Sequence, residues 1–96
     1  METARRTLET ASNLITGSRQ ESHGAYSHEA ERIGIAWGAI LNLPESIPPR
    51  TVAAMMVVLK MMRATAGREN PDDWCDAAGY AALGAQIDAD TAQVWA

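Results

Sequence analysis

Two aspartates three residues apart, Asp73 and Asp76, form the pair whose spacing could support metal chemistry. They follow Asn70 and Pro71, which predict the start of a helix. The side chain of Asn can accept hydrogen bonds from the first free amides of the helix, and Pro lacks the N–H that would have no partner at the first helical position. Positions i and i+3 share one helix face, with Cβ atoms roughly 5–6 Å apart. The two carboxylates could share a divalent ion, or they could simply cap and solubilise the helix.

Two cations, Lys60 and Arg63, occur at the same spacing on the preceding predicted helix. If the two helices pack antiparallel across the short turn at 67–70, these cations reach the level of Asp73 and Asp76. One outcome is a set of interhelical salt bridges, each worth about 0–1 kcal/mol when exposed. The other outcome is an open polar pocket between the helices.

In such a pocket the charged side chains of Lys60 and Arg63 would hold a ligand phosphate. The aromatic ring of Trp74 or Tyr80 would then stack on a base. Arg19, in a glycine-flanked polar loop, could reach the phosphate as well. This arrangement would bind a nucleotide without needing a metal or a catalytic group.

The chain that must position these residues has 47% hydrophobic content, rich in Ala and Met and with no Phe. This composition favours helices over sheets. Hydrophobic spacing and Gly or Pro breaks predict four helices, at 2–16, 27–41, 50–66 and 71–87, with Asp90 capping a final short turn. We therefore predict a single all-α domain over residues 1–96, a compact antiparallel bundle of about four helices with the third one central.

The predicted third helix is apolar around nearly its whole circumference. The residues responsible are Met55, Met56, Val58, Leu59 and Met62. A 96-residue chain has little protein with which to cover such a helix. The sequence therefore predicts a homodimer or higher oligomer, with this helix and Trp37 near the contact. The residues expected to point inward from the second helix are Ile33, Trp37, Ile40 and Leu41.

Charge and composition exclude several classes of protein. The net charge of −4 and the lack of a basic stripe argue against broad nucleic-acid binding. Cys75 is the single cysteine, so it cannot form an internal disulfide. Apolar runs fall short of the roughly 20 residues that span a bilayer. These features predict a cytoplasmic protein that does not associate with membranes.

Ordered motifs over roughly residues 14 to 84 resemble a phage and prophage family of unknown function. They are Gly17-Ser18-Arg19-Gln20, His23-Gly24, Glu29…Ile33…Trp37, Val52-Ala53…Met55-Met56…Leu59-Lys60…Arg63 and Asp73-Trp74…Asp76…Ala78-Gly79-Tyr80-Ala81-Ala82-Leu83. The resemblance implies a phage protein that acts in the host cytoplasm.

A weaker resemblance links Asp73-x-x-Asp76 to the second acidic motif of the MazG-like all-α nucleoside triphosphate pyrophosphohydrolases. It implies Mg²⁺ bound by these aspartates, with Glu29 as the remaining helical acid. Where those enzymes carry an earlier Glu-x-x-Glu, the preceding helix here carries Lys60-x-x-Arg63. The acidic constellation is therefore only half present.

Three functions remain open at this stage. The leading hypothesis is a non-catalytic protein that binds a nucleotide or nucleotide-derived signal and sequesters it from host defence. The alternative is a Mg²⁺-dependent MazG-like nucleotide pyrophosphohydrolase. The second alternative is a helical oligomer that binds and blocks a host protein.

Overall fold

The structure, a computed structural model, describes residues 1–17, 25–67 and 70–95. Most of these residues belong to four helices, which are α1 (Glu2–Thr16), α3 (Tyr26–Ile40), α4 (Pro49–Ala64) and α5 (Pro71–Trp95). The described residues contain no strand. The all-α class and the four predicted helices are therefore confirmed.

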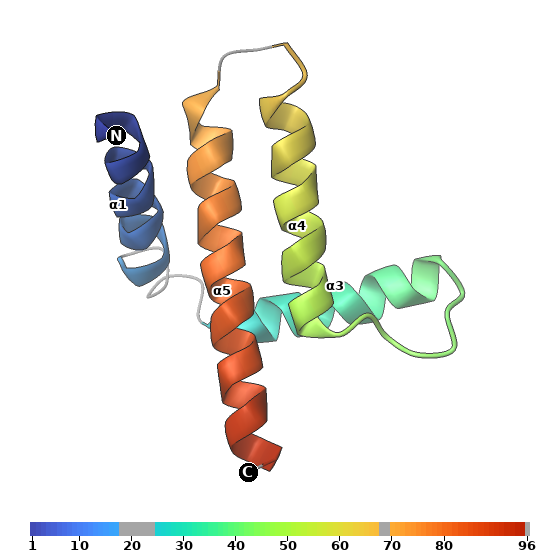
Figure 1. The fold of residues 1–96 in the computed structure, drawn as a ribbon. Coiled ribbons are helices and arrows are strands. Elements are labelled where there is room, and N and C mark those ends of the chain that lie inside the picture. The colour runs from blue at the N-terminus through green and yellow to red at the C-terminus, as the bar shows by residue number, and fades with distance from the viewer. Residues whose placement is uncertain (18–24, 68–69, 96) are drawn as a thin grey trace.

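The helices are arranged less compactly than the predicted bundle (Figure 1). Helices α4 and α5 form an antiparallel hairpin, and α1 lies beside α5 and runs in the same direction as it. Helix α3 crosses the hairpin at a steep angle near the N-terminal end of α4. The C-terminal end of α3 projects away from the other helices. Helix α5 packs against all three other helices, so α5 is the central element. The prediction that the third helix would be central is wrong.

The start of α5 has the capping arrangement that the sequence predicts. The amide of Asp72 donates a hydrogen bond to Oδ1 of Asn70 at 3.2 Å, and Pro71 is the first helical residue. The helix then continues past residue 87 to Trp95. Gln86 donates to Asp90 across one helical turn at 2.9 Å, so Asp90 lies inside α5 instead of capping a separate turn.

Two glycines on one face of α3 determine where the following segment lies. The amide of Ile47 donates to the carbonyl of Gly34 at 3.1 Å, and the amide of Leu43 donates to the carbonyl of Gly38 at 2.9 Å. A Cβ on Gly34 would meet the carbonyl oxygen of Ile47 at 2.0 Å. The chain after α3 can therefore fold back along the helix only because this face has no side chains.

A small core forms where α3, α4 and α5 meet. Its buried members are Ala30, Val52 and Ile87, with Tyr26, Ile33, Trp37 and Ile47 packed around them. Ile33 and Trp37 lie at the core as predicted, whereas Ile40 and Leu41 are exposed. The last two lie beyond the point where α3 leaves the hairpin, and this explains the difference.

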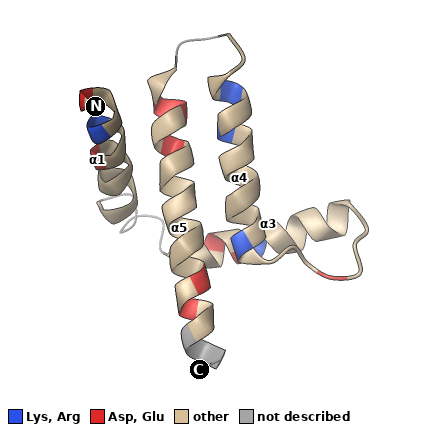
Figure 2. Cartoon of the chain, in the orientation of Figure 1, with Lys and Arg blue, Asp and Glu red and all other residues tan. Residues whose placement is uncertain are grey.

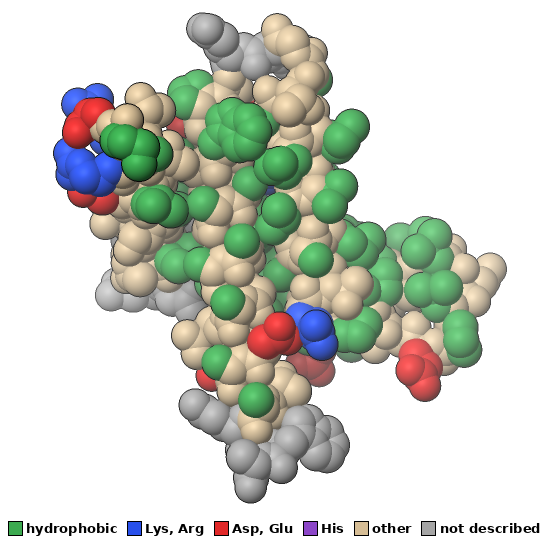
Figure 3. All heavy atoms as spheres, in the orientation of Figure 1, with side chains coloured by type: hydrophobic (Ala, Val, Ile, Leu, Met, Phe, Trp, Pro, Cys, Tyr) green, Lys and Arg blue, Asp and Glu red, His purple; other side chains and the backbone are tan. Residues whose placement is uncertain are grey.

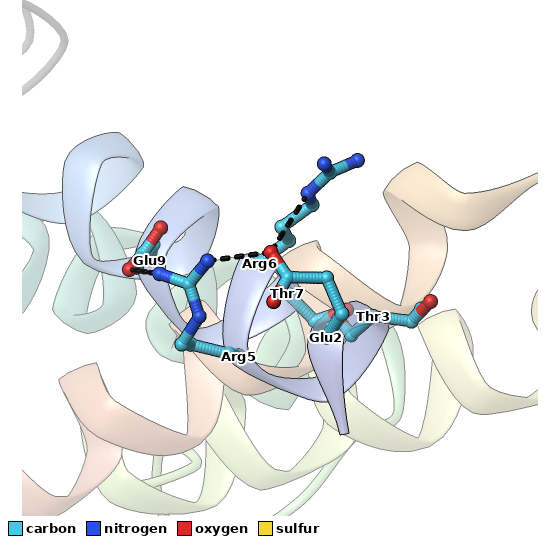
Figure 4. Close-up of polar contacts among 6 residues, drawn as sticks. All are labelled: Glu2, Thr3, Arg5, Arg6, Thr7 and Glu9. Atoms are coloured by element: carbon cyan, nitrogen blue, oxygen red, sulfur yellow. Dashed lines mark hydrogen bonds and ion pairs between the residues drawn. The ribbon is translucent and has the colours of Figure 1, made fainter.

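Helix α1 presents a charged face to solvent at its N-terminal end (Figure 4). Arg5 pairs with Glu2 and Glu9, and Arg6 also pairs with Glu2. These are exposed pairs within one helix, each worth about 0.3–0.5 kcal/mol. They support α1 locally and leave its opposite face to pack on α5.

Candidate functional site

The four charged residues singled out from the sequence meet between α4 and α5. The ammonium of Lys60 lies 3.0 Å from Oδ2 of Asp76 and 4.0 Å from Oδ1 of Asp73. Nε of Arg63 lies 3.3 Å from Oδ1 of Asp73. Figure 2 shows basic positions near the C-terminal end of α4 at about the same height as acidic positions near the start of α5.

The antiparallel hairpin accounts for this meeting. Each charged pair has i, i+3 spacing, so it lies along one face of its own helix. The short connection between the helices, which includes Gly67 with φ +88, sets both pairs at about equal distances from the turn. Asp73 is only 2% exposed. Burial of its carboxylate is tolerated because two cations pair with it.

The arrangement is a neutral cluster of paired charges, in which the Lys60 side chain is largely covered and the Arg63 side chain is 58% exposed. Two positive and two negative side chains pair with one another. A ligand phosphate would have to displace Asp73 or Asp76 from Lys60 before it could bind there. Displacement would leave a buried carboxylate without its partner, and that carries a large electrostatic cost.

The residues present do not fit the Mg²⁺ site implied by the MazG-like resemblance. The ammonium of Lys60 already supplies a positive charge between the two aspartates. Glu29 is exposed in the first turn of α3. Among the residues that the structure describes, no three His, Cys, Asp or Glu side chains are placed to hold a metal ion, so Glu29 does not join Asp73 and Asp76.

The two predicted base-stacking residues have different surroundings in the structure. Trp74 is 46% exposed at the start of α5. Tyr80 packs against Tyr26, with ring centroids 5.7 Å apart and planes inclined by 58°. Arg19 lies outside the described residues.

Burial raises the pKa of Tyr26 to about 12, with smaller contributions from Tyr80 and Glu29.

A groove of about 630 Å³ lies farther along the hairpin, between the first half of α4 and the middle of α5. Its lining includes Tyr80 and several small residues, which are Ala53, Ala54, Ala81, Gly84 and Ala85. Arg50 and Asp88 also line it and pair with each other at 3.1 Å. Sequence reasoning missed this groove, although facing runs of small residues on two adjacent helices were a signal for it.

The outward face of α4 carries a second feature, an exposed stripe of large apolar side chains. We call it the α4 stripe, and it consists of Met55, Val58, Leu59 and Met62. Their i, i+3, i+4, i+7 spacing places them on one side of the helix. Val58 is 60% exposed and Met62 is 66% exposed. A shallow depression of about 520 Å³ lies over the N-terminal part of this stripe.

Figure 3 shows hydrophobic side chains gathered over the visible face of α4 and α5 and again along the projecting end of α3. The methionine-rich helix, which the sequence predicts to lie near a contact between copies, has exposed apolar side chains in the structure. Trp37, which was expected beside it at a contact, lies half-buried in the core instead. Its helix turns away from the α4 stripe and its ring packs inward.

The fold and sequence define an all-α, phage-associated protein. The chain matches the domain of unknown function DUF6378 over residues 6–88 and belongs to that family. It is also similar to the Gene 55 protein of Mycobacterium phage L5, with 37% identity over 76 residues. That alignment covers 79% of this chain and 48% of the phage protein, so the chain spans about half the length of that relative.

No solved structure matches the chain significantly. Within the described parts of the chain, none of the helices combines the length and apolar character needed to cross a bilayer. The family resemblance predicted from the sequence motifs is confirmed. Neither the family match nor the similarity to the phage protein supports the resemblance to MazG-like enzymes.

Proposed function

We propose that this protein acts through protein–protein contacts, as a helical unit that self-associates and blocks a host protein. The observation that carries the proposal is the α4 stripe, whose side chains are exposed, whereas the basic residues of the same helix pair with aspartates of α5. Contiguous exposed apolar surface of this kind marks protein interaction sites. Fully burying a large apolar side chain is worth roughly 1.5–3 kcal/mol, so a partner that covers these partly exposed side chains gains a fraction of that value from each.

The chemistry of the charge cluster supports the same choice. A non-catalytic nucleotide site there would need free cations, whereas Lys60 is largely covered and pairs with Asp76, and Arg63 pairs with the buried Asp73 through Nε. A pyrophosphohydrolase would need Mg²⁺ between acids, at the position where the structure has an ammonium. The cluster is suited to fastening α4 to α5, and this holds the α4 stripe in place.

Binding of a nucleotide-derived small molecule, sequestered from host defence, is the second candidate. The groove beside Tyr80 and Arg50 favours it, because its volume of about 630 Å³ falls within the 300–1,000 Å³ that is usual for ligand pockets. An aromatic ring and a guanidinium are the groups that such a ligand would use. Under this proposal the ligand lies away from the charge cluster.

Thermal denaturation with a panel of nucleotides and cyclic nucleotides, with and without Mg²⁺, separates the candidates. A ligand at about 100 times its Kd stabilises by about 2.7 kcal/mol, and this raises the Tm of a domain of this size by about 10 °C or more. We expect no such shift, and a Tm that rises with protein concentration. A nucleotide shift that Arg50→Met abolishes and Lys60→Met leaves intact would favour the groove and contradict our proposal.

The choice of Lys60→Met in this experiment follows from the structure. Lys60→Glu would place a third carboxylate beside Asp73 and Asp76, and the resulting repulsion would unfold the hairpin whether or not a ligand binds there. Methionine keeps the length of the side chain and removes only the charge. Arg50→Met is its counterpart on the same helix, at the exposed pair with Asp88.

A further inference from the structure

The chain exposes more surface than a compact monomer of its size. Its accessible surface is 7076 Å², whereas the scaling for monomeric proteins gives about 5,400 Å² for 10.3 kDa. Its radius of gyration is 14.5 Å, against about 12.5 Å for a compact chain of this length. The excess of about 1,700 Å² is more than the roughly 800 Å² that one partner contributes to a standard interface.

Two exposed apolar surfaces lie on different elements of the chain. One is the α4 stripe. The other, which we call the arm tip, consists of Ile40, Leu41 and Leu43 at the projecting end of α3. Ile40 is 75% exposed. The arm stands away from the hairpin at a steep angle (Figure 1), so the chain has the outline of a bracket with apolar side chains on both limbs.

We infer that the arm tip of one copy covers the α4 stripe of a second copy, and that the second copy returns the same contact. This inference rests on the proposed protein-binding function, and it names a second copy of the chain as the partner that covers the α4 stripe. A reciprocal contact closes about a two-fold axis, which is the commonest symmetry of homo-oligomers. A standard interface needs about 800 Å² from each copy, which is about half of the excess surface that each copy exposes.

The arm is held in place before any partner binds. The hydrogen bonds from Ile47 to Gly34 and from Leu43 to Gly38 tie the returning segment along α3. The arm tip is therefore presented on a braced helix, and little ordering cost opposes the contact. Charge does not oppose it either, because the residues of the arm tip and of the α4 stripe are uncharged and the basic residues of α4 already pair with aspartates of α5.

Sedimentation velocity on the full chain and two opposite-charge variants tests the inference. Leu41→Glu places a carboxylate in the arm tip, and Val58→Lys places an ammonium in the α4 stripe. We expect the wild type to sediment at about twice 10.3 kDa. Each variant alone should sediment as a monomer, with Kd raised at least about 100-fold, because an unpaired charge opposes burial in an apolar contact.

An equal mixture of the two variants is the decisive sample. A mixed pair keeps one native contact and places Glu against Lys in the other, so the dimer should reappear in the mixture. Circular dichroism confirms that each variant keeps its helices. His28→Glu, an exposed position at the other end of α3, is the matched control and should remain dimeric.

The failures are distinguishable. A dimeric Leu41→Glu with a monomeric Val58→Lys would overturn the role of the arm and leave the proposed function intact, with the α4 stripe covered by something else. A mixture that stays monomeric would overturn the reciprocal contact. A monomeric wild type would overturn the second copy as partner. Dimers of both variants would overturn the inference and the α4 stripe as the binding surface together.

Discussion

The ammonium of Lys60 lies 3.0 Å from the carboxylate of Asp76, across the seam between α4 and α5. This contact places a side-chain cation where a metal ion would have to lie if Asp73 and Asp76 were to share one. The same ammonium is 4.0 Å from the buried Asp73. The pairing therefore fastens α4 to α5, and it holds the apolar surface of α4 in position.

The first prediction concerns the stability of this seam. Lys60→Met should lower the free energy of unfolding by about 2–3 kcal/mol, because it leaves two carboxylates, one of them buried, without their shared cation. Arg50→Met is the matched control, since it removes an exposed α4–α5 pair and should cost less than about 1 kcal/mol. Urea denaturation of both variants provides the comparison. Equal losses would mean that burial of Asp73 has no energetic consequence.

The second prediction concerns the glycine face of α3. Gly34→Ala should destabilise the protein by about 3 kcal/mol, because its Cβ would lie 2.0 Å from the carbonyl oxygen of Ile47 and the backbone would have to move. Gly79→Ala is the control on α5, where the new Cβ would lie 3.4 Å from Cγ2 of Ile15. That substitution should stay within about 1 kcal/mol of wild type, with helix propensity favouring Ala. Thermal unfolding monitored by circular dichroism measures both.

The third prediction concerns Tyr26, whose hydroxyl is buried with no hydrogen-bond partner among the described residues. Tyr26→Phe removes an unsatisfied polar group, so the free energy of unfolding at pH 7 should stay the same or rise by about 1 kcal/mol. A fall of that size would show that the hydroxyl makes a stabilising hydrogen bond after all.

Tyr26 should also give the wild type a distinctive alkaline response. Burial raises the pKa of Tyr26 to about 12, whereas an unfolded tyrosine ionises near 10. Between these values the unfolded chain releases a proton that the folded chain retains, so this contribution to stability is intact below pH 10 and is lost as the pH rises towards 12. Urea denaturation at pH 9, 10 and 11 should show a shallower decline for Tyr26→Phe than for wild type.

The fourth prediction separates the two faces of α4 with two valines. Val52 is fully buried in the core, whereas Val58 belongs to the exposed α4 stripe. At low protein concentration Val52→Ala should cost about 2 kcal/mol and Val58→Ala close to nothing, since only the first leaves a cavity. At high concentration Val58→Ala should lose stability relative to wild type, because dimerisation contributes there. A cost for Val58→Ala that is independent of concentration would contradict the assembly.

Local sequence signals located the helices well. Asn70 and Pro71 predicted the start of α5, and Gly17 predicted the end of α1. The prolines near residue 48 predicted the break between α3 and α4. These residues act through the backbone within one turn, so local sequence is sufficient to place them. The i, i+3 spacing of the charges also sufficed to predict their meeting, since two helices joined by a short turn can hardly pack any other way.

Which apolar face each helix buries was decided only by the tertiary structure. Helix α4 has large apolar residues around most of its circumference, so periodicity could not choose between Val52 inside and Val58 outside. The direction of α3 depended on Gly34 and Gly38 accepting the returning backbone, a long-range fit that no local pattern expresses. Whether the charges formed a pocket or a closed seam likewise depended on distances between helices, which spacing along the chain does not fix.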